Sequence, residues 1–226
     1  MRIVAAKKIL KANDQLAEEN RRWFQAQGVF GINLVGSPGC GKTTLLEGLI
    51  RQLAGCISPA VIEGDIAGQV DADRMERIGV PVVQINTESM CHLDATMIAA
   101  AREGIDWSRV DMLFIENVGN LVCTAGFDLG EHLRIVALSA PEGDDKLVKY
   151  PTIFQRSDAL VITKTDMLPY CNFDVERVRG DMKRLAPDAE VFAVSALRGG
   201  GLDELARWLV AARTRVQAAK APKCSP

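Results

Sequence analysis

One octapeptide constrains the fold of this chain more than any other feature of its sequence. It reads Gly36-Ser37-Pro38-Gly39-Cys40-Gly41-Lys42-Thr43 and fits the pattern G-x-x-x-x-G-K-[ST]. It follows an apolar run and opens a helical pattern, which separates a phosphate-binding loop from a chance glycine-rich turn. Glycines let the backbone wrap around phosphates with its N–H groups pointing inward, and the helix N-terminus adds a favourable dipole. The sequence therefore predicts a nucleotide site that continues to Thr44, in which Lys42 reaches the β- and γ-phosphates.

Short apolar runs alternate with helical patterns along most of the chain. Seven runs predict strands, over residues 30–35, 60–62, 80–85, 110–115, 133–138, 159–163 and 190–194. Helical patterns lie over residues 42–53, 67–78, 92–102, 175–185 and 202–212. This alternation predicts an α/β P-loop NTPase fold, a mostly parallel sheet of about seven strands with helices on both faces. An amphipathic helix over residues 1–28 precedes the P-loop domain (29–212), and a flexible tail (213–226) follows it.

The composition excludes several classes of protein. The 226 residues carry 27 Lys and Arg against 29 Asp and Glu, a net charge of −2, so no basic field for nucleic acid is expected. The longest uncharged run, residues 28–41, is broken by Gly and Pro and is too short to span a membrane. The first ten residues contain no apolar signal segment. We therefore expect a cytoplasmic protein whose six cysteines are free thiols or metal ligands.

A second motif addresses the choice of nucleotide. Thr163-Lys164-Thr165-Asp166 follows a predicted strand and is similar to the N-K-x-D element of GTPases, with Thr in place of the usual Asn. The Asp carboxylate of that element accepts two hydrogen bonds from guanine, a donor pair that adenine lacks. Lys164 would lie along the base and ribose, and the loop containing Ser195 and Ala196 would close the base pocket. The Thr offers a hydroxyl but no amide, so we expect a weakened tether between loops.

Two acidic residues end predicted strands near the nucleotide. Asp65 closes the run 61–65, and Glu116 closes the run 113–116, with Gly119 three residues later. Carboxylates at such positions hold Mg²⁺, so we predict Thr43, Asp65 and Glu116 as magnesium residues and Lys42, Asp65 and Glu116 as catalytic. The Gly119 N–H is predicted to sense a γ-phosphate. An alternative for Asp65 is a helix cap before residue 66.

Cys91, His92 and Cys123 follow strands that end at the same edge of the sheet. Thiolate and imidazole together suit Ni²⁺, Zn²⁺ or copper. The spacing fits no metal-finger pattern, and buried structural thiols remain an open alternative. The other four cysteines have no evident partner in the sequence: Cys40, Cys56, Cys171 and Cys224.

The run Phe114-Ile115-Glu116-Asn117-Val118-Gly119-Asn120-Leu121-Val122-Cys123 is more specific than any of these motifs. Together with residues 82–87 and Cys91-His92-Leu93-Asp94-Ala95, it resembles the HypB family of the SIMIBI P-loop class, GTPases that help insert nickel into [NiFe]-hydrogenase. The resemblance covers roughly residues 30–208. It implies GTP binding, hydrolysis to GDP and phosphate, and a metal site shared across a nucleotide-responsive dimer, with Cys91, His92 and Cys123 as ligands of Ni²⁺ or Zn²⁺. We expect slow turnover, because no catalytic Arg or Gln is evident near Gly119.

The resemblance also implies partners. The first is a second copy of the chain in a GTP-dependent homodimer, formed through a helix around Met167, Leu168 and Cys171. The others are a nickel chaperone and the hydrogenase large-subunit precursor. The chain lacks the cysteine-rich and histidine-rich start of many members, and Thr96 stands where they have a further histidine. We therefore expect no nickel store in these residues.

Three alternatives remain open at this point. A urease-accessory GTPase is disfavoured because its Cys-Pro-His motif is absent. A P-loop kinase or ligase for small molecules would transfer the phosphoryl group to an acceptor and would show little preference for guanine. A protein that binds the nucleotide without hydrolysing it is compatible with every motif above.

Overall fold

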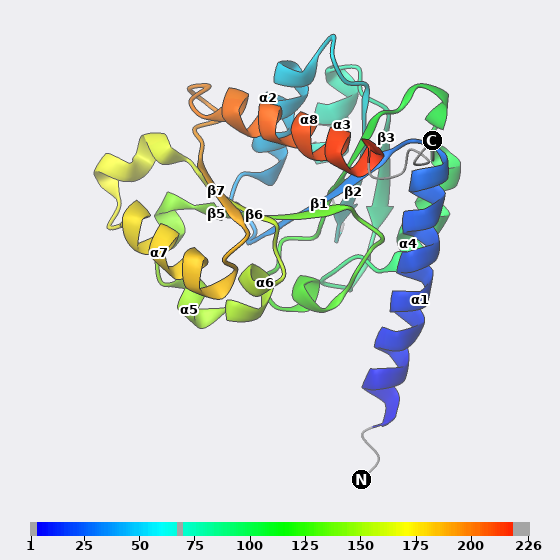
Figure 1. Cartoon of the computed structure of the whole chain (residues 1–226), viewed down its shortest axis with the longest axis horizontal. Helices are drawn as coiled ribbons and strands as arrows, with labels where there is room; N and C mark the ends of the chain where they lie inside the picture. Colours follow the sequence, from blue (N-terminus) through cyan, green and yellow to red (C-terminus); the bar gives the residue numbers. More distant parts are fainter. Residues whose placement is uncertain (1–3, 67–69, 219–226) are drawn as a thin grey trace, which may run out of the picture.

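The computed structural model describes residues 4–66 and 70–218, and its centre is a parallel sheet of seven strands in the order β3-β2-β4-β1-β5-β6-β7 (Figure 1). Every neighbouring pair of strands runs parallel. The strands are β1 (Phe30–Gly36), β2 (Pro59–Asp65), β3 (Val82–Asn86), β4 (Met112–Glu116), β5 (Leu133–Ser139), β6 (Ala159–Thr163) and β7 (Glu190–Ala193). The predicted fold class is thus confirmed.

Eight α-helices of the described chain precede, connect or follow these strands. They are α1 (Val4–Ala26), α2 (Lys42–Leu53), α3 (Val70–Arg77), α4 (Ala95–Ala101), α5 (Lys146–Lys149), α6 (Pro151–Gln155), α7 (Val175–Leu185) and α8 (Leu202–Ala218). Five 3₁₀ turns complete the described elements: η1 (Arg102–Gly104), η2 (Trp107–Arg109), η3 (Cys123–Gly126), η4 (Ala140–Glu142) and η5 (Thr165–Tyr170).

The helices form one layer on each face of the sheet. Successive strand residues point to opposite faces, so Val61 packs with α2, α3 and α8, whereas Ile62 packs with α1 and α4. Helices α5, α6 and α7 cover β5 and β6 on the same face as α1 and α4. Both faces are therefore buried, which explains why the strands are apolar without alternation.

Helix α1 packs against α4 on the outside of the sheet (Figure 1). The Asn20 side chain of this helix is fully buried and donates to the carbonyls of Ala95 (2.8 Å) and Leu129 (3.1 Å). Asn13 donates to the Asp128 carbonyl (2.8 Å) and accepts from the Ala95 N–H (2.9 Å). The predicted position of the N-terminal helix is confirmed, and its contacts brace the start of α4 and the loop at residues 128–129.

Several predicted boundaries differ from the structure. Helix α4 begins at Ala95 and not at residue 92, because the Asp94 carboxylate accepts the Met97 N–H and caps the helix there. Cys91 and His92 therefore lie in a loop. The short helices α5 and α6 were not predicted. Residues 67–69 of the helix predicted over 67–78 lie outside the described residues.

The last helix extends beyond its predicted end. It runs to Ala218, because the Arg213 guanidinium binds the Asp111 carboxylate (2.5 Å) and carbonyl (3.2 Å). The first part of the predicted flexible tail is therefore helical, which corrects that expectation for residues 213–218. Cys224 lies outside the described residues.

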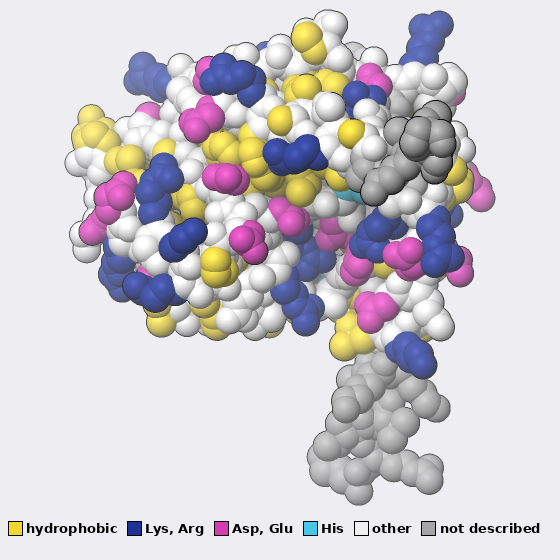
Figure 2. Space-filling view, in the orientation of Figure 1, with side chains coloured by type: hydrophobic (Ala, Val, Ile, Leu, Met, Phe, Trp, Pro, Cys, Tyr) yellow, Lys and Arg dark blue, Asp and Glu magenta, His cyan; other side chains and the backbone are white. Residues whose placement is uncertain are grey.

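The surface carries no field of a single sign on the face seen in Figure 2, where basic and acidic side chains are interspersed. This agrees with the net charge of −2. Within residues 4–66 and 70–218, none of the helices is both long and apolar enough to cross a bilayer.

Candidate nucleotide and metal site

The phosphate-binding loop joins β1 to α2 at the carboxyl edge of the sheet. Gly39 (φ +74°) and Gly41 (φ +91°) adopt left-handed backbone conformations that only glycine takes without strain. A pocket of about 480 Å³ opens beside the loop. It is lined by Pro38, Gly39, Gly41, Lys42, Thr43, Thr44, Glu63, Gly64, Asp65, Ile66, Arg74, Glu116, Asn117, Val118, Gly119 and Lys164. Most of the residues predicted for the phosphate end of the nucleotide meet in this pocket.

One end of this pocket is rich in oxygen ligands. The Thr43 hydroxyl donates to a Glu116 carboxylate oxygen (2.9 Å), and both side chains are buried. Glu63 lies opposite Glu116 in the register of β2 and β4 and is also buried. Asp65 lines the same pocket and accepts the Ile66 N–H (2.6 Å). Carboxylates and a hydroxyl form the donor set that Mg²⁺ prefers, so these residues fit that ion.

The predicted base-binding residues converge on the next loops along the sheet. The Ser195 hydroxyl donates to Asp166 (2.5 Å), and this hydrogen bond is the main cause that lowers the pKa of that carboxyl. The Lys164 ammonium donates to the Gly39 carbonyl (2.6 Å), which ties this loop to the phosphate-binding loop. Ala196 follows in a turn. Lys164 lines the phosphate pocket, and Asp166 lies two residues further along the chain, outside that lining.

Thr163 forms a tether between the same two loops. Its hydroxyl donates to the Cys40 carbonyl at 2.6 Å, and its side chain is buried. Cys40 itself is fully buried, its sulfur lies where a side chain on Gly36 would stand, and burial raises the pKa of its thiol to about 11. Cys40 can therefore face a nucleotide only through its backbone.

The segment after Glu116 lies directly against the phosphate-binding loop. A Cβ placed on Gly119 would lie 2.8 Å from the Pro38 Cα, so only glycine fits there. The Asn120 N–H donates to the Gly36 carbonyl (2.9 Å) and forms an antiparallel bridge with it. The segment and the phosphate-binding loop are therefore in direct contact, so that a displacement of either one requires the other to adjust.

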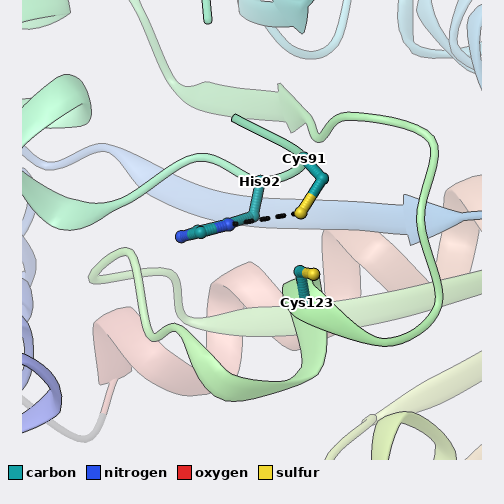
Figure 3. Close-up of side chains that lie close together, drawn as sticks. All are labelled: Cys91, His92 and Cys123. Atoms are coloured by element: carbon teal, nitrogen blue, oxygen red, sulfur yellow. Dashed lines mark hydrogen bonds between the residues drawn. The ribbon is translucent and has the colours of Figure 1, made fainter. Parts of the chain in front are cut away.

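Cys91, His92 and Cys123 come together at the end of that segment (Figure 3). Their ligand atoms all lie within 4.8 Å of one another, and Cys91 Sγ is 3.9 Å from His92 Nδ1. All three side chains are partly exposed. Two residues precede α4 and the third begins η3, so the cluster joins two separate loops.

The His92 ring is held and kept neutral by its surroundings. It stacks on Phe127, with ring centroids 3.9 Å apart and an interplanar angle of 28°. Burial lowers the pKa of His92, while the charge of Asp94 opposes this effect. Lowering the pKa favours the neutral imidazole, the form that binds a metal. Two thiols and one such imidazole suit Ni²⁺ or Zn²⁺.

Comparison with known proteins places this geometry in a family. Residues 31–193 match the family model for the CobW/HypB/UreG nucleotide-binding domain. The chain is 48% identical over 211 residues to the hydrogenase maturation factor HypB of Azotobacter vinelandii, covering 93% of this chain and 70% of that protein. It is 46% identical over 194 residues to the hydrogenase/urease maturation factor HypB of Helicobacter hepaticus, covering 83% and 78%. The chain belongs to the HypB family.

A solved HypB structure shares the whole fold. The crystal structure of HypB from Helicobacter pylori in complex with nickel superimposes with a TM-score of 0.87 at 40% identity. The match covers 91% of this chain and 97% of that one. The family expected from the run at residues 114–123 is thus confirmed.

Four residues of this HypB-family site were not singled out from the sequence. Glu63 and Arg74 line the nucleotide pocket, where Arg74 donates to the Thr44 hydroxyl (3.2 Å) and pairs with Glu47 (2.9 Å). Glu63 stands two residues before Asp65 on the same strand, so period-two spacing could have indicated it. Nothing local in the sequence marks Arg74 or Phe127, whereas the buried Asn117 lies inside the family run at residues 114–123.

The remaining thiols divide by exposure. Cys56 is exposed, and Cys171 is half-buried beside η5. Met167 and Tyr170 on η5 are exposed large side chains, at the position where the HypB resemblance implies a dimer contact. Neither of these thiols has a metal-binding neighbour among the described residues.

Proposed function

We propose that this chain is a GTP-hydrolysing metallochaperone that binds Ni²⁺ at Cys91, His92 and Cys123 and releases it during [NiFe]-hydrogenase maturation. GTP is the substrate, and the nickel ion is the cargo. The names of its relatives support the maturation role, and the nickel complex of the Helicobacter pylori protein supports the cargo. Zn²⁺ has the same donor preference and competes for the site.

One observation carries the coupling of the two activities. The segment from Glu116 to Cys123 begins at the Thr43 hydroxyl and ends at a thiol of the metal cluster. A γ-phosphate that binds the Gly119 N–H would move the part of this segment from Gly119 onward, where Gly119 packs on Pro38. Because Cys123 lies on the same segment, this movement changes the distance between its thiol and the Cys91–His92 pair.

Hydrolysis uses the charged end of the pocket. Lys42 binds the β- and γ-phosphates, while Thr43, Asp65 and Glu116 hold Mg²⁺, which when bound neutralises phosphate charge. Asp65 lies at the end of β2 and lines the pocket, which supports a role in orienting the attacking water. No glutamine lines the described pocket, and its arginine, Arg74, is paired with Glu47, so turnover is expected to be slow.

The deciding experiment is equilibrium binding of Ni²⁺ and Zn²⁺ to the protein without nucleotide, with GDP and with a non-hydrolysable GTP analogue. We expect stoichiometric tight binding of the ion, a several-fold change of affinity between GDP and the analogue, and loss of tight binding in Cys91→Ala. Equal affinities in all three states would refute the coupling, and unchanged binding in Cys91→Ala would refute the site. Oligomeric mass measured on the same samples tests the GTP-dependent homodimer.

The kinase or ligase alternative is separated by nucleotide preference. Asp166, held by Ser195, supports recognition of guanine. We expect GTP to bind at least about ten-fold more tightly than ATP, a difference of about 1.4 kcal/mol. Equal affinities would favour the alternative, and phosphate release in a GTP assay separates a GTPase from a protein that only binds.

Partners are tested in cells. A relative named as a hydrogenase/urease maturation factor makes both enzymes relevant readouts. We expect the gene to restore hydrogenase activity in a strain lacking its own HypB, through a nickel chaperone and the hydrogenase large-subunit precursor. Restoration of urease activity alone would favour the urease-accessory alternative.

A further inference from the structure

Both the backbone and the side chain of Asn120 form hydrogen bonds. Its backbone N–H donates to the Gly36 carbonyl (2.9 Å), and its own carbonyl accepts the Thr124 hydroxyl (2.6 Å). Its side-chain oxygen accepts the N–H groups of Val122 (2.7 Å) and Cys123 (3.3 Å). A single residue therefore bonds the start of the phosphate-binding loop and holds the turn that presents the Cys123 thiol.

The side-chain amide of Asn120 reaches the other thiol. The Cys91 thiol is hydrogen-bonded to the Cys123 thiol and to the Asn120 side chain. The amide of Asn120 thus donates toward the Cys91 sulfur. Asn120 contacts both sulfur-bearing loops of the cluster.

The Cys91–His92 loop has a different anchor. The Asn117 side chain accepts the Leu93 N–H (3.1 Å) and donates to the Asn33 side chain (3.2 Å). Asn33 lies in the middle of β1 and is fully buried, and Asn117 is only 1% exposed. This half of the cluster is bonded to the core of the sheet, whereas the Cys123 half is bonded to the edge of the nucleotide loop.

We propose that Asn120 is the positioning residue that transmits the state of the phosphate-binding loop to Cys123. The inference rests on the proposed nucleotide-controlled metal release and names the residue that performs it. When Gly119 moves toward a γ-phosphate, the bridge between Asn120 and Gly36 moves with it. The Asn120 side chain then shifts the Cys123 turn relative to Cys91, whose loop stays bonded to Asn117.

The test compares three variants. Asn120→Ala removes the acceptor for Val122 and Cys123 together with the amide donor. Asn120→Asp has the same shape and keeps the acceptor. The matched control is Asn86→Ala, because the exposed Asn86 side chain accepts the Glu88 N–H (2.9 Å) in a turn before Cys91 but is not bonded to the phosphate-binding loop.

The primary readout needs no metal. The alkylation rate of Cys123 by iodoacetamide is measured by peptide mass spectrometry in GDP and in a GTP analogue, with the exposed Cys56 as internal reference. We expect the two rates to differ by about five-fold or more in the wild type, the lower end of ordinary allosteric coupling. Asn86→Ala and Asn120→Asp should keep this ratio, and Asn120→Ala should bring it within about two-fold of unity.

Two outcomes overturn the inference. The first is that Cys123 of the wild type is alkylated at the same rate in GDP and in the GTP analogue. The second is that Asn120→Ala keeps the wild-type ratio of these two rates while its thermal unfolding midpoint is unchanged. If Asn120→Ala unfolds, the Asn120→Asp ratio decides, because loss of the ratio there contradicts transmission through the acceptor. Ni²⁺ titrations of the same samples test the proposed function separately: absence of tight nickel binding refutes the cargo and leaves the alkylation result standing.

Discussion

At the scale of the residue, Thr163 shows how a substitution can keep part of the role of the residue it replaces. The sequence predicts a weakened tether, because a hydroxyl replaces an amide. In the structure the Thr163 hydroxyl still joins its loop to the Cys40 carbonyl at 2.6 Å. The Lys164 ammonium adds a second tether to Gly39 (2.6 Å), so the two loops stay joined.

The base pocket gives a prediction for the dependence of selectivity on pH. Hydrogen bonding by Ser195 lowers the pKa of Asp166, so the carboxylate stays ionised to a lower pH and guanine recognition is lost only as the pH falls through that lowered value. Ser195→Ala should raise the pKa and move the loss of selectivity to higher pH. The ratio of GTP to ATP affinity, measured from about pH 2 to 6, reports this midpoint, which lies below the ordinary Asp value in the wild type. Equal midpoints in variant and wild type would contradict the role of Ser195.

The thiol inside the phosphate-binding loop gives a second prediction. Burial raises the pKa of Cys40 to about 11, so only about one thiol in a thousand is ionised at pH 8. Iodoacetamide should label the exposed Cys56 at least about ten-fold faster than Cys40 in the native protein. Denaturant should remove the difference, and peptide mass spectrometry measures both rates. Equal labelling in the native state would mean that the loop opens readily.

At the scale of the element, helix α1 does more than cover the sheet. Its asparagines bond Ala95 and the loop at residues 128–129. Ala95 lies three residues after His92, and residue 128 follows Phe127, which stacks on the His92 ring. The helix therefore braces the two segments that hold the imidazole in place.

Replacement of Asn20 should lower stability. Asn20→Ala leaves the buried carbonyls of Ala95 and Leu129 without their side-chain donor, and such groups cost about 1–3 kcal/mol. Urea denaturation measures the free energy of unfolding. The control is Arg22→Ala on the same helix, because the exposed Arg22–Glu18 pair contributes less than about 1 kcal/mol. Equal losses in the two variants would contradict the brace.

The sequence predicts elements better than it predicts contacts between them. Apolar runs locate all seven strands within a few residues, because burial on both faces leaves the strands with few polar positions. The start of α4 is missed, since the cap by Asp94 depends on the fold of its own loop. The phosphate-binding loop has a local pattern, whereas Arg74 meets Glu47 and Asn120 meets Gly36 only when distant segments come together.

At the scale of the whole molecule, the nucleotide and metal sites share one edge of the sheet and one connecting segment. Coupling between two binding sites is reciprocal by thermodynamic necessity. If the GTP analogue weakens Ni²⁺ binding by some factor relative to GDP, Ni²⁺ must weaken binding of the analogue relative to GDP by that same factor.

This reciprocity can be measured directly. Affinities of GDP and of the analogue are determined with and without saturating Ni²⁺, and we expect the two coupling factors to agree within about two-fold. The Cys91→Ala/Cys123→Ala double variant is the control, because it should show no effect of nickel on either nucleotide. An effect of nickel that persists in this variant would place the responsible ion elsewhere, such as among the carboxylates of the phosphate pocket.

The bridge between Asn120 and Gly36 has a consequence for the time course of these events. The Asn120 amide hydrogen is bonded to the last residue of β1, so it exchanges with solvent deuterium only when the segment lifts from the sheet. That one hydrogen records each opening of the connection between phosphate and thiol. Under the proposed function, its exchange rate therefore reports the population of the opened connection that would precede release of the metal.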